Sequence, residues 1–240
     1  MEKSILEINN LSYAYDKTKV LDNVAFQCNR GEVLVIAGPN GSGKTTLIKL
    51  LFGLLDNKKG SIKIFGSDNT DISHKKKMYY LSSENILPQF LTGDEYVRMM
   101  CRLYDIKIDE EKYKKLISYY AMEHRINHLI ENYSHGMVKK IQLITAFILQ
   151  SEITVVDETL NGIDIEAKEV SKTLFRKLAE KDKLVIMCTH DLDLAEKLGN
   201  RAILLYKGTV KDIVNLKEKD CNLTEIFKNL VGFKESDYEI

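Results

Sequence analysis

Long apolar runs are missing from this sequence of 240 residues. No uncharged apolar stretch approaches the ~18 residues needed to cross a bilayer. The N-terminal MEKSILEINNLSY also has no apolar core of signal-peptide length. We therefore expect a chain that is soluble by itself, so that any work at a membrane depends on spans supplied by another polypeptide.

A net charge is also missing, because Lys plus Arg and Asp plus Glu number 35 each. Without an overall positive field, the composition gives no reason to expect a nucleic acid as a partner. The four cysteines form no C-x-x-C pair and have no histidine at metal-ligand spacing. We expect reduced, mostly buried residues of a cytosolic protein at Cys28, Cys101, Cys188 and Cys221.

Proline is scarce, with Pro39 and Pro88 alone, and no low-complexity linker or repeat divides the chain. A single domain is therefore predicted, long enough to bury a core. The basic run His74–Lys77 is expected to be an exposed, solvated loop.

Strand patterns of two kinds mark the predicted core. Residues 4–13 and 20–28 alternate apolar and polar side chains, as in an antiparallel sheet with one face toward water. Short continuous apolar runs, typical of strands buried on both faces, occur at 32–37, 153–156 and 184–188. Because helical patterns alternate with the buried runs, the sequence predicts an α/β fold with a parallel sheet and an antiparallel β edge subdomain.

Helical spacing of apolar residues replaces these strand patterns from about Glu95 to Gln150. This predicts an all-helical subdomain inserted in the parallel-sheet core, and a short docking helix follows in the tail. The predicted parts of the single domain, 1–240, are the core at 1–82 and 151–216, the helical insertion at about 83–150, and the C-terminal tail at 217–240.

A glycine-rich motif, GPNGSGKTT, follows the 32–37 run directly and matches G-x-x-x-x-G-K-[ST]. A phosphate chain needs many converging N–H donors, and a loop poor in side chains lets the backbone wrap closely around it. We expect Lys44 to contact the β- and γ-phosphates and the Thr45 hydroxyl to ligate Mg²⁺. The predicted nucleotide-binding residues here are Gly38, Pro39, Asn40, Gly41, Ser42, Gly43, Lys44, Thr45 and Thr46.

Acidic residues and a histidine end the other two buried runs. Asp157, at the tip of its strand, suits a second Mg²⁺ contact, usually through water. Glu158 is the candidate general base that polarises an attacking water. His190, after the last run, can donate a hydrogen bond to a γ-phosphate or hold that water.

In this order, these motifs resemble the nucleotide-binding subunit of ATP-binding-cassette (ABC) transporters, from about Leu6 to Leu230. The resemblance implies a P-loop NTPase core that uses ATP and Mg²⁺. In that family the motif L-S-G-G-Q, at a helix N-terminus, contacts the γ-phosphate of ATP bound to the other subunit of a head-to-tail dimer.

The stretch YSHGM takes the place of that signature, with Ser134 and Gly136 matching and His135 and Met137 departing. A serine N-cap, a glycine N–H and the helix dipole together suit an anion. The resemblance implies that this stretch contacts a second chain's ATP and has no partner within its own chain.

Further positions are implied by the resemblance one at a time. Tyr15 matches the aromatic residue that stacks on adenine, although Tyr13 lies close enough to leave the choice open. Residues 161–164 resemble the loop that crosses the dimer interface, with Asp164 as its acid. Thr159 stands where proline is usual, a change expected to affect backbone stiffness more than chemistry.

The largest departure lies in the loop that joins the core to the helical insertion. Alignment puts Ser83, or by a one-residue slip Glu84, where a glutamine normally contacts Mg²⁺ and water; Gln89 is in the wrong register. Serine is too short to reach as glutamine does, so metal affinity or coupling is expected to be unusual.

The implied function is ATP hydrolysis by a dimer of ABC subunits, homomeric or heteromeric, that drives an integral membrane permease. The subunit would be cytoplasmic and peripheral on the inner face of the cell membrane. The Y-S-x-G-M form resembles export systems for peptides, antibiotics or lipids. Two alternatives stay open: an ABC ATPase not tied to transport, and a regulatory switch that binds ATP and barely hydrolyses it.

Overall fold

The computed structural model describes residues 4–84, 86–218 and 221–232. The chain divides into two compact units. Unit 1 comprises Met1–His74 and Ile186–Ile240, and unit 2 comprises Lys75–Val185. Among the helices of the described part, none combines the length and apolar character needed to cross a bilayer.

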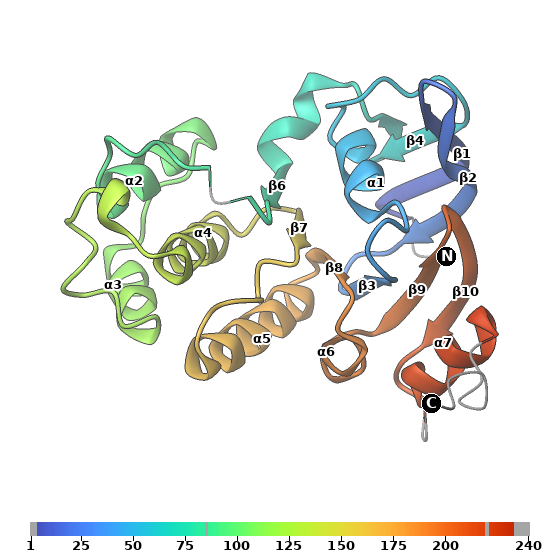
Figure 1. The fold of residues 1–240 in the computed structure, drawn as a ribbon. Helices are drawn as coiled ribbons and strands as arrows, with labels where there is room; N and C mark the ends of the chain where they lie inside the picture. Colours follow the sequence, from blue (N-terminus) through green and yellow to red (C-terminus); the bar gives the residue numbers. More distant parts are fainter. Residues whose placement is uncertain (1–3, 85, 219–220, 233–240) are drawn as a thin grey trace. The chain divides into compact units, whose positions relative to one another are not determined.

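Unit 1 contains an antiparallel sheet that includes both alternating segments predicted from the sequence. Its strands, in spatial order, are β2 (Thr18–Cys28), β1 (Leu6–Tyr15), β4 (Ser61–Ile64) and β5 (Ser67–Asp68) (Figure 1). In β2 every second residue from Val24 to Cys28 is buried, as alternation on a one-sided sheet requires. The antiparallel pair is confirmed, whereas the short strands β4 and β5 were not predicted.

A second set of strands in unit 1 leads to the glycine-rich motif. In spatial order these are β10 (Thr209–Asn215), β9 (Arg201–Tyr206), β3 (Val33–Ala37) and β8 (Leu184–Thr189), whose first two residues belong to unit 2. β9 runs parallel to β3 and antiparallel to β10. All five residues of β3 are buried, which confirms the strand predicted from its continuous apolar run.

The helices of unit 1 are short. They are α1 (Lys44–Leu51), which begins at the predicted lysine, α6 (Leu192–Leu198) and α7 (Leu223–Val231). α7 confirms a helix in the tail: Leu223 is buried, and the Phe227 ring meets the Tyr206 ring edge-on at 6.2 Å. Leu230, on the same helix, remains 38% exposed, so only part of the expected docking face is covered.

Unit 2 carries the helical region. Its strands β6 (Met78–Leu81) and β7 (Ile153–Asp157) pair in parallel, and its helices are α2 (Gly93–Leu103), α3 (Glu110–Tyr119), η2 (Ile130–Asn132), α4 (His135–Leu149) and α5 (Ile165–Glu180). In the described residues between β6 and β7 there are helices and no named strand, as the spacing of apolar residues indicates. The boundaries of the predicted insertion stay a prediction.

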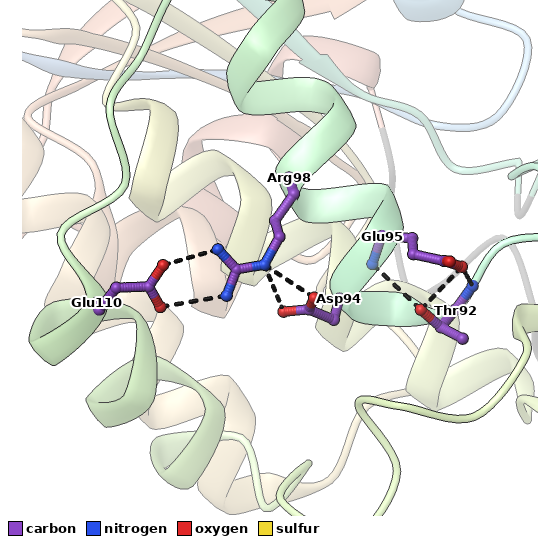
Figure 2. A network of polar contacts seen from close by, with 5 residues as sticks. All are labelled: Thr92, Asp94, Glu95, Arg98 and Glu110. Carbon is purple, nitrogen blue, oxygen red and sulfur yellow. Dashed lines mark hydrogen bonds and ion pairs between the residues drawn. The ribbon is translucent and has the colours of Figure 1, made fainter.

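A polar network ties α2 to the start of α3 (Figure 2). Thr92 and Glu95 form a capping box at the start of α2. The Arg98 guanidinium donates to Asp94 Oδ2 at 2.8 Å and to Glu110 Oε1 at 2.7 Å. This hydrogen bonding lowers the pKa of Glu110 from its ordinary value and raises the pKa of Arg98. The network thus fixes the first turns of two helices by charge-assisted bonds.

Two sequence expectations concern His74 and the cysteines. The prediction that the basic run is an exposed loop was wrong for His74. The run lies in the 3₁₀ helix η1 (Ile72–Lys77), and the imidazole is buried. The centroids of the His74 and Phe65 rings are 5.4 Å apart. All four cysteines are free, as expected, and three are buried while Cys221 is half-buried.

Candidate nucleotide-binding site

The glycine-rich loop joins β3 to α1, and close packing requires glycine at two of its positions, Gly38 and Gly43. A Cβ on Gly38 would lie 2.1 Å from the Leu205 carbonyl oxygen on β9. Gly43 has φ +106°, and a Cβ there would lie 2.6 Å from Leu21 Cδ2 on β2. No L-residue with a side chain fits either position without displacing its neighbours. The loop is therefore held between strands at the point where α1 begins.

Three polar side chains of this loop fit a phosphate and its metal. Lys44 is buried, and its Nζ donates to the carbonyl oxygens of Gly38 at 2.7 Å and Pro39 at 3.1 Å, so the ammonium lies inside the curve of the loop. Ser42 Oγ is buried and makes no hydrogen bond within the described residues. Thr45 is exposed in the first turn of α1, where a hydroxyl can reach a bound cation.

His190 lies next to the strand end that contacts this loop. The Gly38 amide donates to the Thr189 carbonyl at 3.3 Å, which brings the end of β8 beside the start of the loop. Asp191 then caps α6 by accepting from the Leu194 amide at 2.9 Å. His190, between the two, is exposed.

The two tyrosines considered for adenine stacking are neighbours in unit 1. Their rings meet edge-on with centroids 5.0 Å apart, and Tyr15 is 43% exposed whereas Tyr13 is half-buried. The turn after Tyr15 leads into Val20, whose carbonyl oxygen would lie 3.1 Å from a Cβ on Gly43. Greater exposure favours Tyr15, and the choice between the two stays a prediction.

In unit 2, the predicted acidic pair ends β7. Asp157 is 2% exposed, and one of its carboxylate oxygens accepts a hydrogen bond from the Tyr80 hydroxyl at 3.1 Å. Glu158 has φ +52°, the left-handed region that costs an L-residue about 1–2 kcal/mol. Such strain concentrates at functional sites, where the surroundings hold it in place. Asp157 thus belongs to strand β7, whereas Glu158, the next residue, has a left-handed backbone.

Thr159 has a contact that sequence reasoning missed. Its hydroxyl donates to the Leu81 carbonyl at 3.2 Å, joining the end of β7 to the end of β6. Because the two residues are far apart in the chain, no sequence signal could have indicated this bond. Ser83 follows two residues after Leu81 and is exposed, and neither Ser83 nor Glu84 is favoured as the metal-contacting position.

Ser134 is the N-cap of α4, where its hydroxyl accepts from the Met137 amide at 3.3 Å. That this stretch contacts a second chain's ATP stays a prediction, and within its own chain it packs against a loop. A Cβ on Gly136 would lie only 3.2 Å from the Gly162 carbonyl oxygen, so the start of α4 packs closely on the 158–164 loop. A side chain at this position would require the loop to move by a few tenths of an ångström.

Two lysines of α4 also contact the 158–164 loop. Lys139 Nζ donates to the Asn161 carbonyl, and Lys140 Nζ lies 2.5 Å from Asp164 Oδ2. Asp164 also caps α5 by accepting from the Ala167 amide at 2.8 Å. Lys140 is the main cause, and this cap a further one, of the lowered pKa of Asp164.

The predicted site residues thus fall into two groups, one in each unit. Unit 1 brings together the glycine loop, Lys44, Thr45, His190 and the tyrosines; unit 2 brings together Asp157, Glu158, Ser134, Gly136 and Asp164. In the described ranges, no three His, Cys, Asp or Glu side chains gather to hold a metal. The Thr45 hydroxyl and the Asp157 carboxylate are each oxygen donors of the kind that Mg²⁺ takes in proteins.

The chain matches one protein-family profile and is similar to one curated protein and to two solved structures described below. The ABC transporter family profile matches residues 21–161, more than half of the chain. The SkfA peptide export ATP-binding protein SkfE of Bacillus subtilis (strain 168) is 29% identical, over 85% of this chain and 86% of that protein. A structure of an ATP-binding subunit of an ABC transporter has a TM-score of 0.88 at 27% identity, covering 95% of this chain and 100% of that one.

A third likeness concerns the catalytic state. The dimeric structure of a post-hydrolysis state of an ATP-binding cassette bound to ADP and Pi has a TM-score of 0.76 at 25% identity, covering 89% of this chain and 99% of that one. Together these structures confirm the predicted α/β fold with a P-loop NTPase core.

Proposed function

Because the chain belongs to the ABC transporter family as an ATP-binding, ATP-hydrolysing subunit, we propose that it drives a separate integral membrane permease in the direction of export. It would work on the cytoplasmic side, at the inner face of the membrane, through that permease. The observation that carries the use of ATP in this proposal is the buried Lys44 ammonium inside a glycine loop that leads into helix α1. The peptide export relative and the Y-S-x-G-M signature support export, with a peptide-like cargo handled by the permease.

In this proposal each site residue has a defined role in hydrolysis. Lys44 holds the β- and γ-phosphates, and Thr45 and Asp157 would hold Mg²⁺, which would supply positive charge beside the phosphate oxygens. Glu158 accepts a proton from the attacking water. The water oxygen bonds to the γ-phosphorus while the bond between the γ-phosphorus and the β-phosphate oxygen breaks. His190 donates to a γ-phosphate oxygen. The products are ADP and inorganic phosphate.

The rest of the site comes from a second subunit. We infer that two copies, or this chain and a related subunit, sandwich two ATP molecules, with Tyr15 stacked on adenine and Ser134 and Gly136 facing the partner's γ-phosphate. Asp164 belongs to the loop at that interface. Ser83, or Glu84 by the one-residue slip, would complete the metal environment through water. The dimeric cassette bound to ADP and Pi supports this arrangement.

The first test is the steady-state ATPase activity of the purified chain across a range of protein concentrations. Specific activity should rise with concentration, because each site needs two subunits. Glu158→Gln should lose at least about 100-fold in kcat, the scale of general-base catalysis, and should form a dimer in ATP. Glu180→Gln, at the exposed end of α5, is the matched control and should keep wild-type activity.

A second candidate function, an ATP-dependent switch, is favoured by the serine in place of glutamine at position 83. It predicts a chain that binds ATP with negligible turnover, even when a candidate permease is added in a membrane. Turnover that depends on Glu158 would exclude this alternative.

A further inference from the structure

Lys139 connects helix α4 to the turn that contains Glu158. The turn closes with a hydrogen bond from the Asn161 amide to the Glu158 carbonyl, at 3.0 Å. The Asn161 carbonyl, on the other side of the same residue, accepts from Lys139 Nζ. A continuous path of two hydrogen bonds therefore runs from the α4 side chain to the Glu158 backbone, all within unit 2.

The Lys139 side chain is also close to the rest of this turn. A Cβ built on Gly162 would lie 3.7 Å from Lys139 Nζ, so the ammonium lies directly against the loop backbone. Lys139 is half-buried, and burial lowers its pKa, while the charge of Glu158 acts in the opposite direction. The carboxylate is thus near enough to stabilise the charged lysine.

The neighbouring lysine acts elsewhere. Lys140 pairs with Asp164, at the far end of the 158–164 loop, where it supports the cap of α5. Consecutive residues on a helix point about 100° apart, so the two lysines hold different parts of the loop. Of these two lysines, Lys139 is the one that contacts the turn that carries the left-handed Glu158.

A left-handed backbone at a glutamate persists only when its surroundings hold it. The Asn161 amide supplies one restraint inside the turn, and the Lys139 ammonium fixes the turn from outside. We propose that Lys139 is a positioning residue for Glu158, holding the 158–161 turn against α4 so that the carboxylate faces its water in one orientation. This inference rests on the proposed role of Glu158 as general base.

The test compares Lys139→Met, which keeps the aliphatic stem and removes the charge, with Lys139→Arg, which restores a donor. In the full chain, Lys139→Met should lower kcat by about 10- to 100-fold, the effect of misplacing a catalytic group, with the KM for ATP and the unfolding midpoint unchanged. Lys139→Arg should recover most of kcat. Lys115→Met, which removes an exposed pair with Glu111 on α3, is the matched control and should match wild type.

Hydrogen exchange of the 158–162 peptide gives a readout that does not depend on turnover. Exchange at Asn161 should be faster in Lys139→Met than in wild type and close to normal in Lys139→Arg. Unchanged exchange in Lys139→Met, or wild-type kcat, would overturn the inference while leaving the proposed function intact. A wild-type chain without Glu158-dependent turnover would instead overturn the proposed function and, with it, the catalytic part of this inference.

Discussion

At the scale of single residues, the Thr159 side chain links the ends of two parallel strands. From the sequence it is a threonine where the family pattern has proline, which suggests a change in stiffness. In the structure its side chain is fully buried and its hydroxyl bonds to the Leu81 carbonyl, two residues before Ser83. A proline has no hydroxyl, so this chain links its two parallel strand ends in a way that proline does not allow.

Replacing Thr159 with valine tests that bond. Thr159→Val should destabilise the chain by about 0.5–1.5 kcal/mol, because the Leu81 carbonyl loses its side-chain donor in a buried place. The measurement is the free energy of unfolding in urea.

The matched control is Thr154→Val on β7. The Thr154 hydroxyl is buried and makes no hydrogen bond within the described residues, so its loss should be neutral or stabilising. Equal losses of stability in both variants would contradict the assigned bond.

At the scale of elements, the junction of α4 and α5 depends on Asp164. This carboxylate both caps α5 and pairs with Lys140 from α4, and both interactions lower its pKa from the ordinary 3.8. Its contribution to stability is therefore complete above the ordinary pKa and is lost as pH falls through the lowered value. The capping bond stabilises the first turn of α5, whereas the pair with Lys140 joins α5 to α4.

Asp164→Asn separates these two contributions, because asparagine caps a helix about as well but carries no charge. At pH 7 we expect a loss of about 0.2–1 kcal/mol, the range for exposed ion pairs. The loss should shrink when pH falls below 3.8, as wild-type Asp164 also becomes neutral. Urea unfolding midpoints at pH 7, 5 and 3 provide the measurement.

Asp109→Asn at the N-cap of α3 is the control, because the Asp109 side chain accepts from the Lys112 amide and forms no ion pair with the residues that the structure describes. Its effect should be smaller at pH 7. A pH-independent loss in Asp164→Asn would count against the Lys140 pair.

At the scale of the whole molecule, thiol reactivity reports on how completely the chain is folded. Burial raises the pKa of Cys28 and of Cys101, and Cys188 is also buried. Cys221 is half-buried, and its pKa is raised first by burial and then by nearby Glu196 and Glu218. Because the thiolate is the reacting species, all but Cys221 should be protected in the folded state.

Titration with an aromatic disulfide reagent at pH 8 should label one thiol of the native chain, more slowly than free cysteine, and all four after unfolding in urea. Cys221→Ser should abolish the native reaction. Rapid labelling of more than one thiol would show that buried parts of the chain open readily.

Much of the fold and part of the site follow from short segments of sequence. The buried strands β3, β7 and β8, the helix at Lys44 and the Ser134 cap were all predicted correctly, because each depends on residues adjacent in the chain. The strand β4 was not predicted, since its four residues hold too little periodicity, and β10 was not predicted because its seven residues lack an alternation of buried and exposed side chains.

By itself, then, the sequence identified the residues expected to bind phosphate and the acidic pair at the end of strand β7, since local motifs encode that chemistry directly. Tertiary structure alone decided which distant groups support them. Thr159 bonds to Leu81 across 78 positions and Lys139 to Asn161 across 22, and Gly136 packs on Gly162. Such contacts depend on how helices and strands pack, and no periodicity along the chain records that packing.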